Sequence, residues 1–372
     1  MGFNCGIVGL PNVGKSTIFN AVTAAGAASA NYPFCTIDPN VGRVAVPDPR
    51  LHEIASVIKP QGILPTSMEF VDIAGLVRGA SKGEGLGNQF LGHIRSTDAV
   101  AHVVRCFEDA DIVHVDGKVD PVRDVSTINT ELIYADVSTV EQTLERYRRL
   151  AKTGQKKILS ILAMLEGIYG HLQGLKPARS FDVQPFVGDL SEVADAYRDM
   201  HLITAKPILY VCNVEEGLAA GDKDNEFTLR VKEMAKEENA RVVIISGKIE
   251  EELSQLDAAS RDEMIKDLGM TEPGLNRLVR AGYETLNLQT YFTAGEKEVH
   301  AWTFSKGDKA PRAAGKIHSD FERGFICAEV YRIKDLLKAG SKAKLKELGL
   351  LRTEGKEYVV QDGDVMEFRF NV

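Results

Sequence analysis

The sequence lacks several features that would mark particular classes of protein. No apolar run reaches the roughly 18 residues that a membrane-spanning helix needs. The first residues lack the basic and then apolar segments of a secretory signal. The five cysteines never form a C-x-x-C pair, so they predict neither a disulfide framework nor a zinc finger, and they favour a reducing, cytoplasmic compartment. These absences argue against secreted and membrane-spanning proteins.

Positive charge is not in excess either. Lys and Arg total 45 against 53 acidic residues, which gives a formal net charge of −8. This balance argues against a protein held to nucleic acid by its global charge, but it leaves room for a local basic patch. With 44% hydrophobic residues in 372, a sizeable core can form. At about 150 residues each, the chain is expected to have two or three domains.

Short apolar runs are spaced widely along the chain, and helix-length segments such as 16–25 and 88–96 lie between them. Each run is almost continuously apolar, as expected for parallel strands that helices cover on both faces. The runs are Asn4–Leu10, Met68–Ile73, Ala99–Cys106, Pro207–Cys212 and Arg241–Ser246. They predict an α/β domain with a doubly wound, mostly parallel sheet, over residues 1–124 and 205–283.

Residues 125–204 interrupt this pattern and predict an inserted α-helical domain, coiled-coil-like in character. Val140, Leu144, Tyr147 and Leu150 recur at three- and four-residue intervals, as on an amphipathic helix. The expected form is a helical hairpin. Either it projects as an arm, or two long surface helices pack on the sheet.

Residues 284–372 predict a small α+β domain. Leu288–Thr293 and Val299–Phe304 have the composition of paired strands around a turn that contains Gly295. A short helix around 317–322 and an apolar strand over Phe325–Tyr331 are expected to follow.

The segment Gly9-Leu10-Pro11-Asn12-Val13-Gly14-Lys15-Ser16 fits the G-x-x-x-x-G-K-[ST] phosphate-loop motif. It follows an expected strand and opens an expected helix, which is the arrangement that the motif requires. The glycines let backbone amides turn toward a polyphosphate, and the helix N-terminus adds partial positive charge. Lys15 can bridge the β- and γ-phosphates. The residues expected to contact nucleotide here are Asn12, Val13, Gly14, Lys15, Ser16 and Thr17. The alternative is a glycine-rich turn with a surface lysine.

A second element supports a nucleotide site with magnesium. Asp72 ends an apolar strand, and Gly75 follows it after two residues. Asp72 is expected to hold Mg²⁺ through water, the amide of Gly75 to contact the γ-phosphate, and the Ser16 hydroxyl to ligate the metal. Thr36, in a proline-flanked loop, would supply a second hydroxyl. Alone, it would be an ordinary loop threonine.

An Asp-x-x-Gly motif after this phosphate loop resembles the translation-factor class of P-loop GTPases. The segments 31–40, NYPFCTIDPN, and 83–92, GEGLGNQFLG, are similar to the YchF family of Obg-like ATPases, and 358–364, YVVQDGD, is similar to that family's C-terminal TGS domain. The similarity covers essentially the whole chain. It implies a P-loop NTPase domain, a helical insertion and a ubiquitin-like TGS domain that ends the chain.

The base-recognition segment departs from the guanine-specific Asn-Lys-x-Asp pattern. Here the strand runs into Asn213-Val214-Glu215-Glu216, so valine replaces the lysine and a longer acid replaces the aspartate. This change predicts loss of strict guanine specificity. The family resemblance implies ATP as the preferred nucleotide, with Asn213, Val214, Glu216 and the loop at Ser246 around the base. A true GTPase stays an alternative.

Water activation must also differ from that of Ras-like GTPases, because Leu76 stands where they place a water-orienting glutamine. His114, in the polar loop 109–120, is the leading candidate to position or deprotonate water. The competing interpretation is a solvated loop histidine. Arg78 and His93 are weaker candidates. The expected activity is slow intrinsic hydrolysis that a partner accelerates.

Two basic clusters suggest a partner surface. One lies in the helical insertion and one in the C-terminal domain: Arg146, Arg148, Arg149, Lys152, Lys156 and Lys157, then Lys334, Lys338, Lys342, Lys344 and Lys346. Such runs can be simply solvated faces. The YchF resemblance favours contact with ribosomal RNA, and it implies that Asn12 could help to hold K⁺. Two classes of function stay open, an ATP-hydrolysing switch at the ribosome and a nucleotide-regulated stress-response module with incidental hydrolysis.

Overall fold

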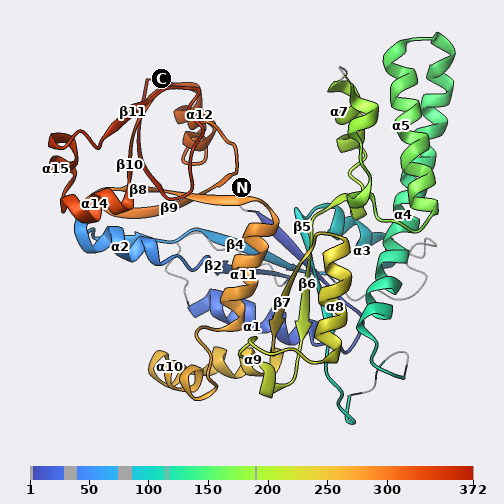
Figure 1. The fold of residues 1–372 in the computed structure, drawn as a ribbon, viewed down its shortest axis with the longest axis horizontal. Coiled ribbons are helices and arrows are strands. Elements are labelled where there is room, and N and C mark those ends of the chain that lie inside the picture. Colours follow the sequence, from blue (N-terminus) through green and yellow to red (C-terminus); the bar gives the residue numbers. More distant parts are fainter. Residues whose placement is uncertain are drawn as a thin grey trace. The chain divides into compact units, whose positions relative to one another are not determined.

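The computed structural model describes residues 3–28, 40–73, 86–112, 114, 117–188 and 191–371 (Figure 1). These residues form two compact units. The first comprises Phe3–Gly42 and Glu69–Ala281, and the second comprises Arg43–Met68 and Gly282–Val372. Among the described residues, no helix combines the length and the apolar character needed to cross a bilayer.

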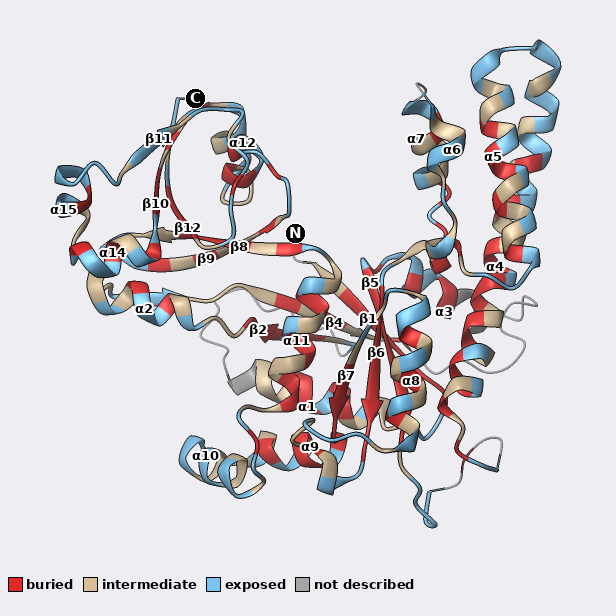
Figure 2. Ribbon diagram, in the orientation of Figure 1, coloured by how far each residue is buried: buried red, intermediate tan, exposed pale blue. Residues whose placement is uncertain are grey.

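A six-stranded sheet with the order β2-β4-β1-β5-β6-β7 runs through the first unit. The neighbours β4 and β1, β1 and β5, β5 and β6, and β6 and β7 are parallel. Every residue of β5 and β6 is buried (Figure 2). The strands are β1 (Asn4–Val8), β2 (Val41–Ala45), β4 (Ser67–Asp72), β5 (Ala99–Arg105), β6 (Ile208–Asn213) and β7 (Arg241–Ile245). The predicted α/β class with a mostly parallel sheet is therefore confirmed.

Several helices of the first unit pack on one another and on the strands of this sheet. Helix α1 packs with α9, and α4 packs with α8 and with β5. The N-termini of α8 and α4 are set by their own capping residues. Asn225 and Thr228 form a capping box at α8, and Asp120 caps α4 ahead of Pro121. The helices are α1 (Lys15–Ala28), α3 (Leu86–Arg95), α8 (Glu226–Glu237), α9 (Gly247–Gln255), α10 (Ala258–Asp267) and α11 (Gly274–Thr285).

The inserted segment is a helical hairpin, as predicted. One part of it packs on the sheet and another part has its own core, so each of the two expected forms describes part of the hairpin. The first turns of α4 bury Val125 and Ile128, beside the sheet strand β5. Farther along, α4 packs instead on α5, and α5 packs on α7, around a separate core that includes Leu144, Leu165 and Leu172. The helices are α4 (Pro121–Leu150), α5 (Lys156–Gln173), α6 (Gln184–Val187) and α7 (Ser191–Asp199).

The second unit is α+β, also as predicted. Its six-stranded sheet has the order β11-β10-β12-β8-β9-β3, and β8 and β9 form the expected antiparallel hairpin around Gly295. Separate apolar clusters form around Phe292 and around Tyr291, neighbours on β8 whose side chains alternate between the faces. The strands are β3 (Gly62–Leu64), β8 (Leu288–Ala294), β9 (Glu298–Ser305), β10 (Phe325–Arg332), β11 (Arg352–Glu354) and β12 (Asp364–Phe370). The helices are α2 (Pro49–Ile58), α12 (Ala310–Ala314), α13 (Ser319–Arg323), α14 (Ile333–Ala339) and α15 (Lys342–Glu347).

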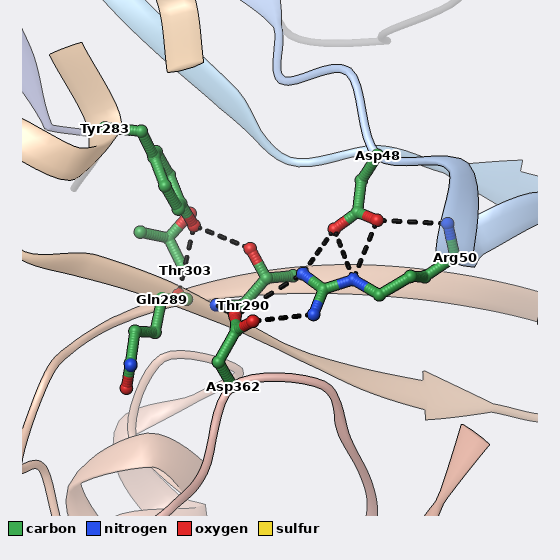
Figure 3. Close-up of polar contacts among 7 residues, drawn as sticks. All are labelled: Asp48, Arg50, Tyr283, Gln289, Thr290, Thr303 and Asp362. Carbon is green, nitrogen blue, oxygen red and sulfur yellow. Dashed lines mark hydrogen bonds and ion pairs between the residues drawn. The ribbon is translucent and has the colours of Figure 1, made fainter. Parts of the chain in front are cut away.

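Residues 43–68 differ from the sequence prediction, which assigned them to the phosphate-loop domain. They belong to the second unit, because β3 pairs with β9 and the α2 side chains Leu51 and Ile54 join the core around Phe292. Figure 3 shows a polar connection that accompanies this packing. Arg50 donates to Asp362 at 2.7 Å, and Asp362 in turn accepts from the amide of Thr290 at 2.9 Å. The domain division otherwise stays a prediction.

Candidate nucleotide-binding site

The loop between β1 and α1 has the backbone that close approach of an anion requires. Gly14 has a φ of 89° and Asn12 a φ of 64°, both in the left-handed region. A Cβ atom on Gly14 would lie 2.1 Å from Nδ2 of Asn213, and one on Gly9 would lie 2.9 Å from the carbonyl oxygen of Val103. Glycine is therefore required at both positions. Strand, turn and helix follow in the predicted order, and α1 begins at Lys15.

Lys15 and Asp72 come from different elements and form an ion pair between Nζ and Oδ1. The parallel register places Asp72 beside Ile7 at the end of β1, just before the loop. The Asp72 amide donates to the carbonyl of Asn40 at 2.8 Å, which fixes the end of β4. Ser16 is exposed on the first turn of α1. The lysine, the hydroxyl and the acid of the predicted site thus come from adjoining parts of the first unit.

The donor set fits magnesium better than a softer metal. A carboxylate and a hydroxyl are hard oxygen ligands, which Mg²⁺ prefers, and Mg²⁺ usually completes its shell with water and phosphate oxygens. Within the described part of the chain, no group of three or more His, Cys, Asp or Glu side chains could form an all-protein metal cage. Thr36 and Gly75, which were predicted to complete this site, lie outside the described residues, as do Cys35, Leu76 and Arg78.

Asn213 connects the phosphate loop to the turn after β7. Its Nδ2 donates to the carbonyl of Val13 at 2.9 Å, and its Oδ1 accepts from the amide of Gly247 at 2.9 Å. The side chain is buried. Asn213 therefore shapes the loop, a role that the sequence analysis did not anticipate when it assigned this residue to the base.

The other predicted base-contact residues differ in exposure. Val214 is buried, and its amide donates to Ile245 at 2.9 Å. Glu216 is exposed, and Lys248 donates to its Oε1 at 2.5 Å. This hydrogen bond and the charge of Glu216 raise the pKa of Lys248. Ser246 is buried at the end of β7, and its hydroxyl has no hydrogen-bond partner among the described residues.

His114 is not a solvated loop residue. The whole residue is only 8% exposed, and its Nε2 lies 2.9 Å from Oδ2 of Asp124 on the first turn of α4. His93, the weaker candidate, is exposed on α3. The structure therefore brings His114 together with a carboxylate that the sequence analysis did not single out.

Arg105 is a second functional candidate that the sequence analysis missed. It is 1% exposed at the end of β5, and its guanidinium donates to three carbonyls of the loop that leads to His114. The acceptors are Phe107 at 3.1 Å, Asp109 at 3.2 Å and Ile112 at 3.0 Å. The sequence analysis had placed His114 in this loop, and the helix-start signal Asp120-Pro121, four residues before Asp124, is the local signal that could have pointed to Asp124.

Two family models match the chain. A model described as "50S ribosome-binding GTPase" matches residues 4–156, and the YchF C-terminal model, described as "Protein of unknown function (DUF933)", matches residues 288–371. The chain is 55% identical to a protein of Haemophilus influenzae and 54% identical to one of Bacillus subtilis, both named Ribosome-binding ATPase YchF. Each alignment has 372 residues and covers 100% of both proteins.

A solved structure matches the fold over nearly the same length. It is titled as the YchF GTPase of Schizosaccharomyces pombe, with a TM-score of 0.86 and 38% sequence identity. The match covers 99% of this chain and 98% of that chain. The names of these relatives agree on the hydrolysis of a nucleoside triphosphate and differ on the base.

Proposed function

The chain belongs to the YchF family, and from that premise we propose that it is a Mg²⁺-dependent ATPase that acts as a molecular switch on the ribosome. The observation that carries the proposal is the contact of Lys15 with Asp72 beside a turn whose glycines admit no side chain. Phosphate, lysine and metal-binding acid meet at this place in P-loop proteins.

The residues of the loop would bind and orient the triphosphate. Amides of the turn and of the first turn of α1 donate to phosphate oxygens, and Lys15 exchanges Asp72 for the β- and γ-phosphates. Ser16, Asp72 through water, and Thr36 would hold Mg²⁺. When bound, the metal ion neutralises the charge that develops on the phosphate oxygens. A K⁺ ion beside Asn12 would add positive charge there, so hydrolysis should be faster in K⁺ than in Na⁺.

The preference for adenine is supported by the environment of Glu216. Its carboxylate is bound to Lys248 at 2.5 Å, so the acid that replaces the guanine-reading aspartate has another partner. The buried Val214 offers no lysine stem to lie over a base. The relatives from Haemophilus influenzae and Bacillus subtilis are named ATPases.

The test compares dissociation constants for ATP and GTP by isothermal titration calorimetry in the presence of Mg²⁺. We expect ATP to bind at least tenfold more tightly. Equal constants, or tighter binding of GTP, would make the protein a GTPase of the same fold.

Hydrolysis is proposed to use His114 to position the attacking water, since Leu76 cannot form a hydrogen bond there. His114 is held at a fixed place by Asp124, as a positioned general base must be. Intrinsic turnover should be slow. If the His114→Ala variant hydrolyses saturating ATP at the parent rate in single-turnover experiments, His114 has no part in the reaction.

Ribosome binding is supported by the names of the relatives and by exposed basic residues. Lys152, Lys156 and Lys157 are exposed where α4 turns into α5. We assign the contact with ribosomal RNA to this turn and to the C-terminal TGS domain, and the site of action to the cytoplasm. Ribosomes should accelerate ATP turnover. A module with incidental hydrolysis would bind ribosomes, or another partner, without acceleration.

A further inference from the structure

The His114 imidazole is held by a side chain from a different element. Asp124 lies on the first turn of α4, ten residues after His114, and its Oδ2 is 2.9 Å from Nε2. The side chains of His114 and Asp124 are 5% and 3% exposed. Because water is largely excluded from this contact, the hydrogen bond is stronger than a surface pair would be.

We propose that Asp124 is a positioning residue for hydrolysis, which orients the His114 ring through Nε2 and fixes its tautomer. An ionised carboxylate only accepts hydrogen bonds, so Nε2 carries the proton and Nδ1 carries the lone pair of the neutral ring. A carboxylate that sets the tautomer of a catalytic histidine has a large effect on rate without touching substrate. The inference rests on the proposed role of His114 and adds a residue to it.

The surrounding contacts fix both ends of the loop that carries His114. At the start, Arg105 binds the three loop carbonyls, and its guanidinium carbon lies 4.8 Å from the centre of the Phe107 ring. At the end, Asp120 accepts from the amide of Arg123 at 3.3 Å and from Arg230 at 2.9 Å. These contacts hold the loop on both sides of His114, and Asp124 contacts the imidazole ring directly.

The pair lies at the edge of the sheet where nucleotides bind in open α/β folds. Cys106 directly follows β5, the neighbour of β1, and its amide donates to the carbonyl of Asn213 at 2.8 Å. A hydrogen bond with Cys212, burial, and the charges of Cys212 and Asp124 raise the pKa of the Cys106 thiol well above its usual value. Helix α4, which carries Asp124 on its first turn, packs on β5, and β5 pairs with β6, whose last residue Asn213 reaches the phosphate loop.

The experiment compares Asp124→Asn with a matched substitution on the same helix. Asp136 is also a buried aspartate of α4, and its hydrogen bonds with described residues come from Ile203 and Thr204, whose amides donate at 2.8 Å each. The variants are Asp124→Asn, Asp136→Asn, His114→Ala and the double variant Asp124→Asn with His114→Ala. For each, one measures ATP affinity, thermal unfolding and single-turnover hydrolysis at saturating ATP and Mg²⁺.

We expect Asp124→Asn to slow hydrolysis by about tenfold to a hundredfold while the Kd for ATP changes by less than about twofold. Asp136→Asn should lower the Tm and leave the hydrolysis rate within about twofold. In the His114→Ala background, Asp124→Asn should cause no further loss, since two residues that act as a unit are not additive. Long-range ¹H–¹⁵N spectra should show the Nε2–H tautomer of His114 in the parent and its loss in Asp124→Asn.

Other results overturn the proposal in distinguishable ways. If His114→Ala is slow but Asp124→Asn keeps the parent rate, Asp124 has no positioning role and the proposed function stands. A faster Asp124→Asn variant would mean that the carboxylate restrains His114, which also overturns the assignment. If His114→Ala keeps the parent rate, the roles of both residues are overturned. If the parent hydrolyses no ATP, the proposed function itself fails.

Discussion

Asn213 joins two loops that lie far apart in the sequence, and its amide is buried. In Asn213→Ala, the carbonyl of Val13 and the amide of Gly247 would both lose their partner, at about 1–3 kcal/mol each. We expect the free energy of unfolding to fall by about 2–6 kcal/mol and the Kd for nucleotide to rise at least tenfold. Urea unfolding and calorimetry measure these quantities. An unchanged Kd would show that the phosphate loop keeps its shape without the bridge.

Lys15 and Asp72 make separable predictions about nucleotide binding. A ligand present at 100 times its Kd stabilises a protein by about 2.7 kcal/mol. We expect ATP with Mg²⁺ to raise the unfolding free energy of the parent accordingly and to leave that of Lys15→Met unchanged. Asp72→Asn should keep the stabilisation by ATP and lose its dependence on Mg²⁺. A Lys15→Met variant that ATP still stabilises to the parent extent would contradict the assigned phosphate site.

His102 on β5 gives a prediction about acid stability. Burial, and to a smaller extent the charge of Arg179, lowers the pKa of His102 to about 3, whereas an unfolded chain has the usual value near 6.5. Below pH 6.5 the unfolded state binds a proton that the native state does not. The free energy of unfolding therefore decreases as the pH is lowered. From pH 6.5 to 5, this costs about 2 kcal/mol.

His102→Phe should therefore lose less unfolding free energy than the parent over that interval, by about the same amount. Urea unfolding at pH 6.5 and pH 5 measures the difference. Equal losses in the two proteins would mean that His102 is not the neutral buried group. Phenylalanine keeps an aromatic ring at this position, where the imidazole of the parent lies 5.8 Å from the ring of Tyr210, centre to centre.

The site residues that could be predicted from the sequence are those whose role is indicated by their immediate neighbours in the chain. Lys15 lies in a contiguous motif, and Asp72 ends an apolar strand, so composition and spacing predicted their elements. Asp124 and Arg105 could not be found in this way, because their partners depend on the path of a loop and on the side of α4 that faces it. Asn213 was singled out, but its two loop contacts depend on strand order.

At the scale of elements, strands with continuous apolar runs were predicted correctly and residues 43–68 were assigned to the wrong unit. The assignment failed because β3 is short and pairs with β9, more than 200 residues later in the chain. Helix α2 is similarly defined by distant partners, since Arg50 binds Asp362 and lies 5.2 Å from the centre of the Phe292 ring. Local sequence does not encode such pairing.

Arg50→Ala tests whether this connection holds the segment. The substitution removes the guanidinium that binds both Asp362 and Asp48, and it leaves Asp362 with the amide of Thr290, so we expect amide hydrogen exchange in α2 and β3 to accelerate at least tenfold. Arg352→Ala is the matched control. Arg352 has a similar side-chain exposure of 41% against 31%, but it binds Glu354 within the C-terminal segment. The Arg50 connection is not needed if exchange over 43–68 is the same in both variants.

At the scale of the whole molecule, the net charge of −8 repels a polyanion such as RNA, whereas the basic turn of the hairpin attracts it. The acidic balance limits non-specific attraction to polyanions, so a local basic surface can determine where an RNA binds. Arg148 and Arg149 are partly compensated, at 3.6 Å from Glu166 and 3.9 Å from Glu145. The lysines of the turn are thus the better target for substitution.

We expect the triple variant Lys152→Glu, Lys156→Glu, Lys157→Glu to weaken ribosome binding while ATP affinity and intrinsic hydrolysis stay within about twofold. Each lost phosphate contact removes about 0.7–0.9 from the slope of log K against log salt, so the slope should decrease by about 2–3. Co-sedimentation at several salt concentrations measures both effects. A triple reversal of Lys338, Lys344 and Lys346 changes the charge equally and tests the C-terminal cluster. If the hairpin variant binds ribosomes with the parent affinity and slope, this turn makes no electrostatic contact with ribosomal RNA.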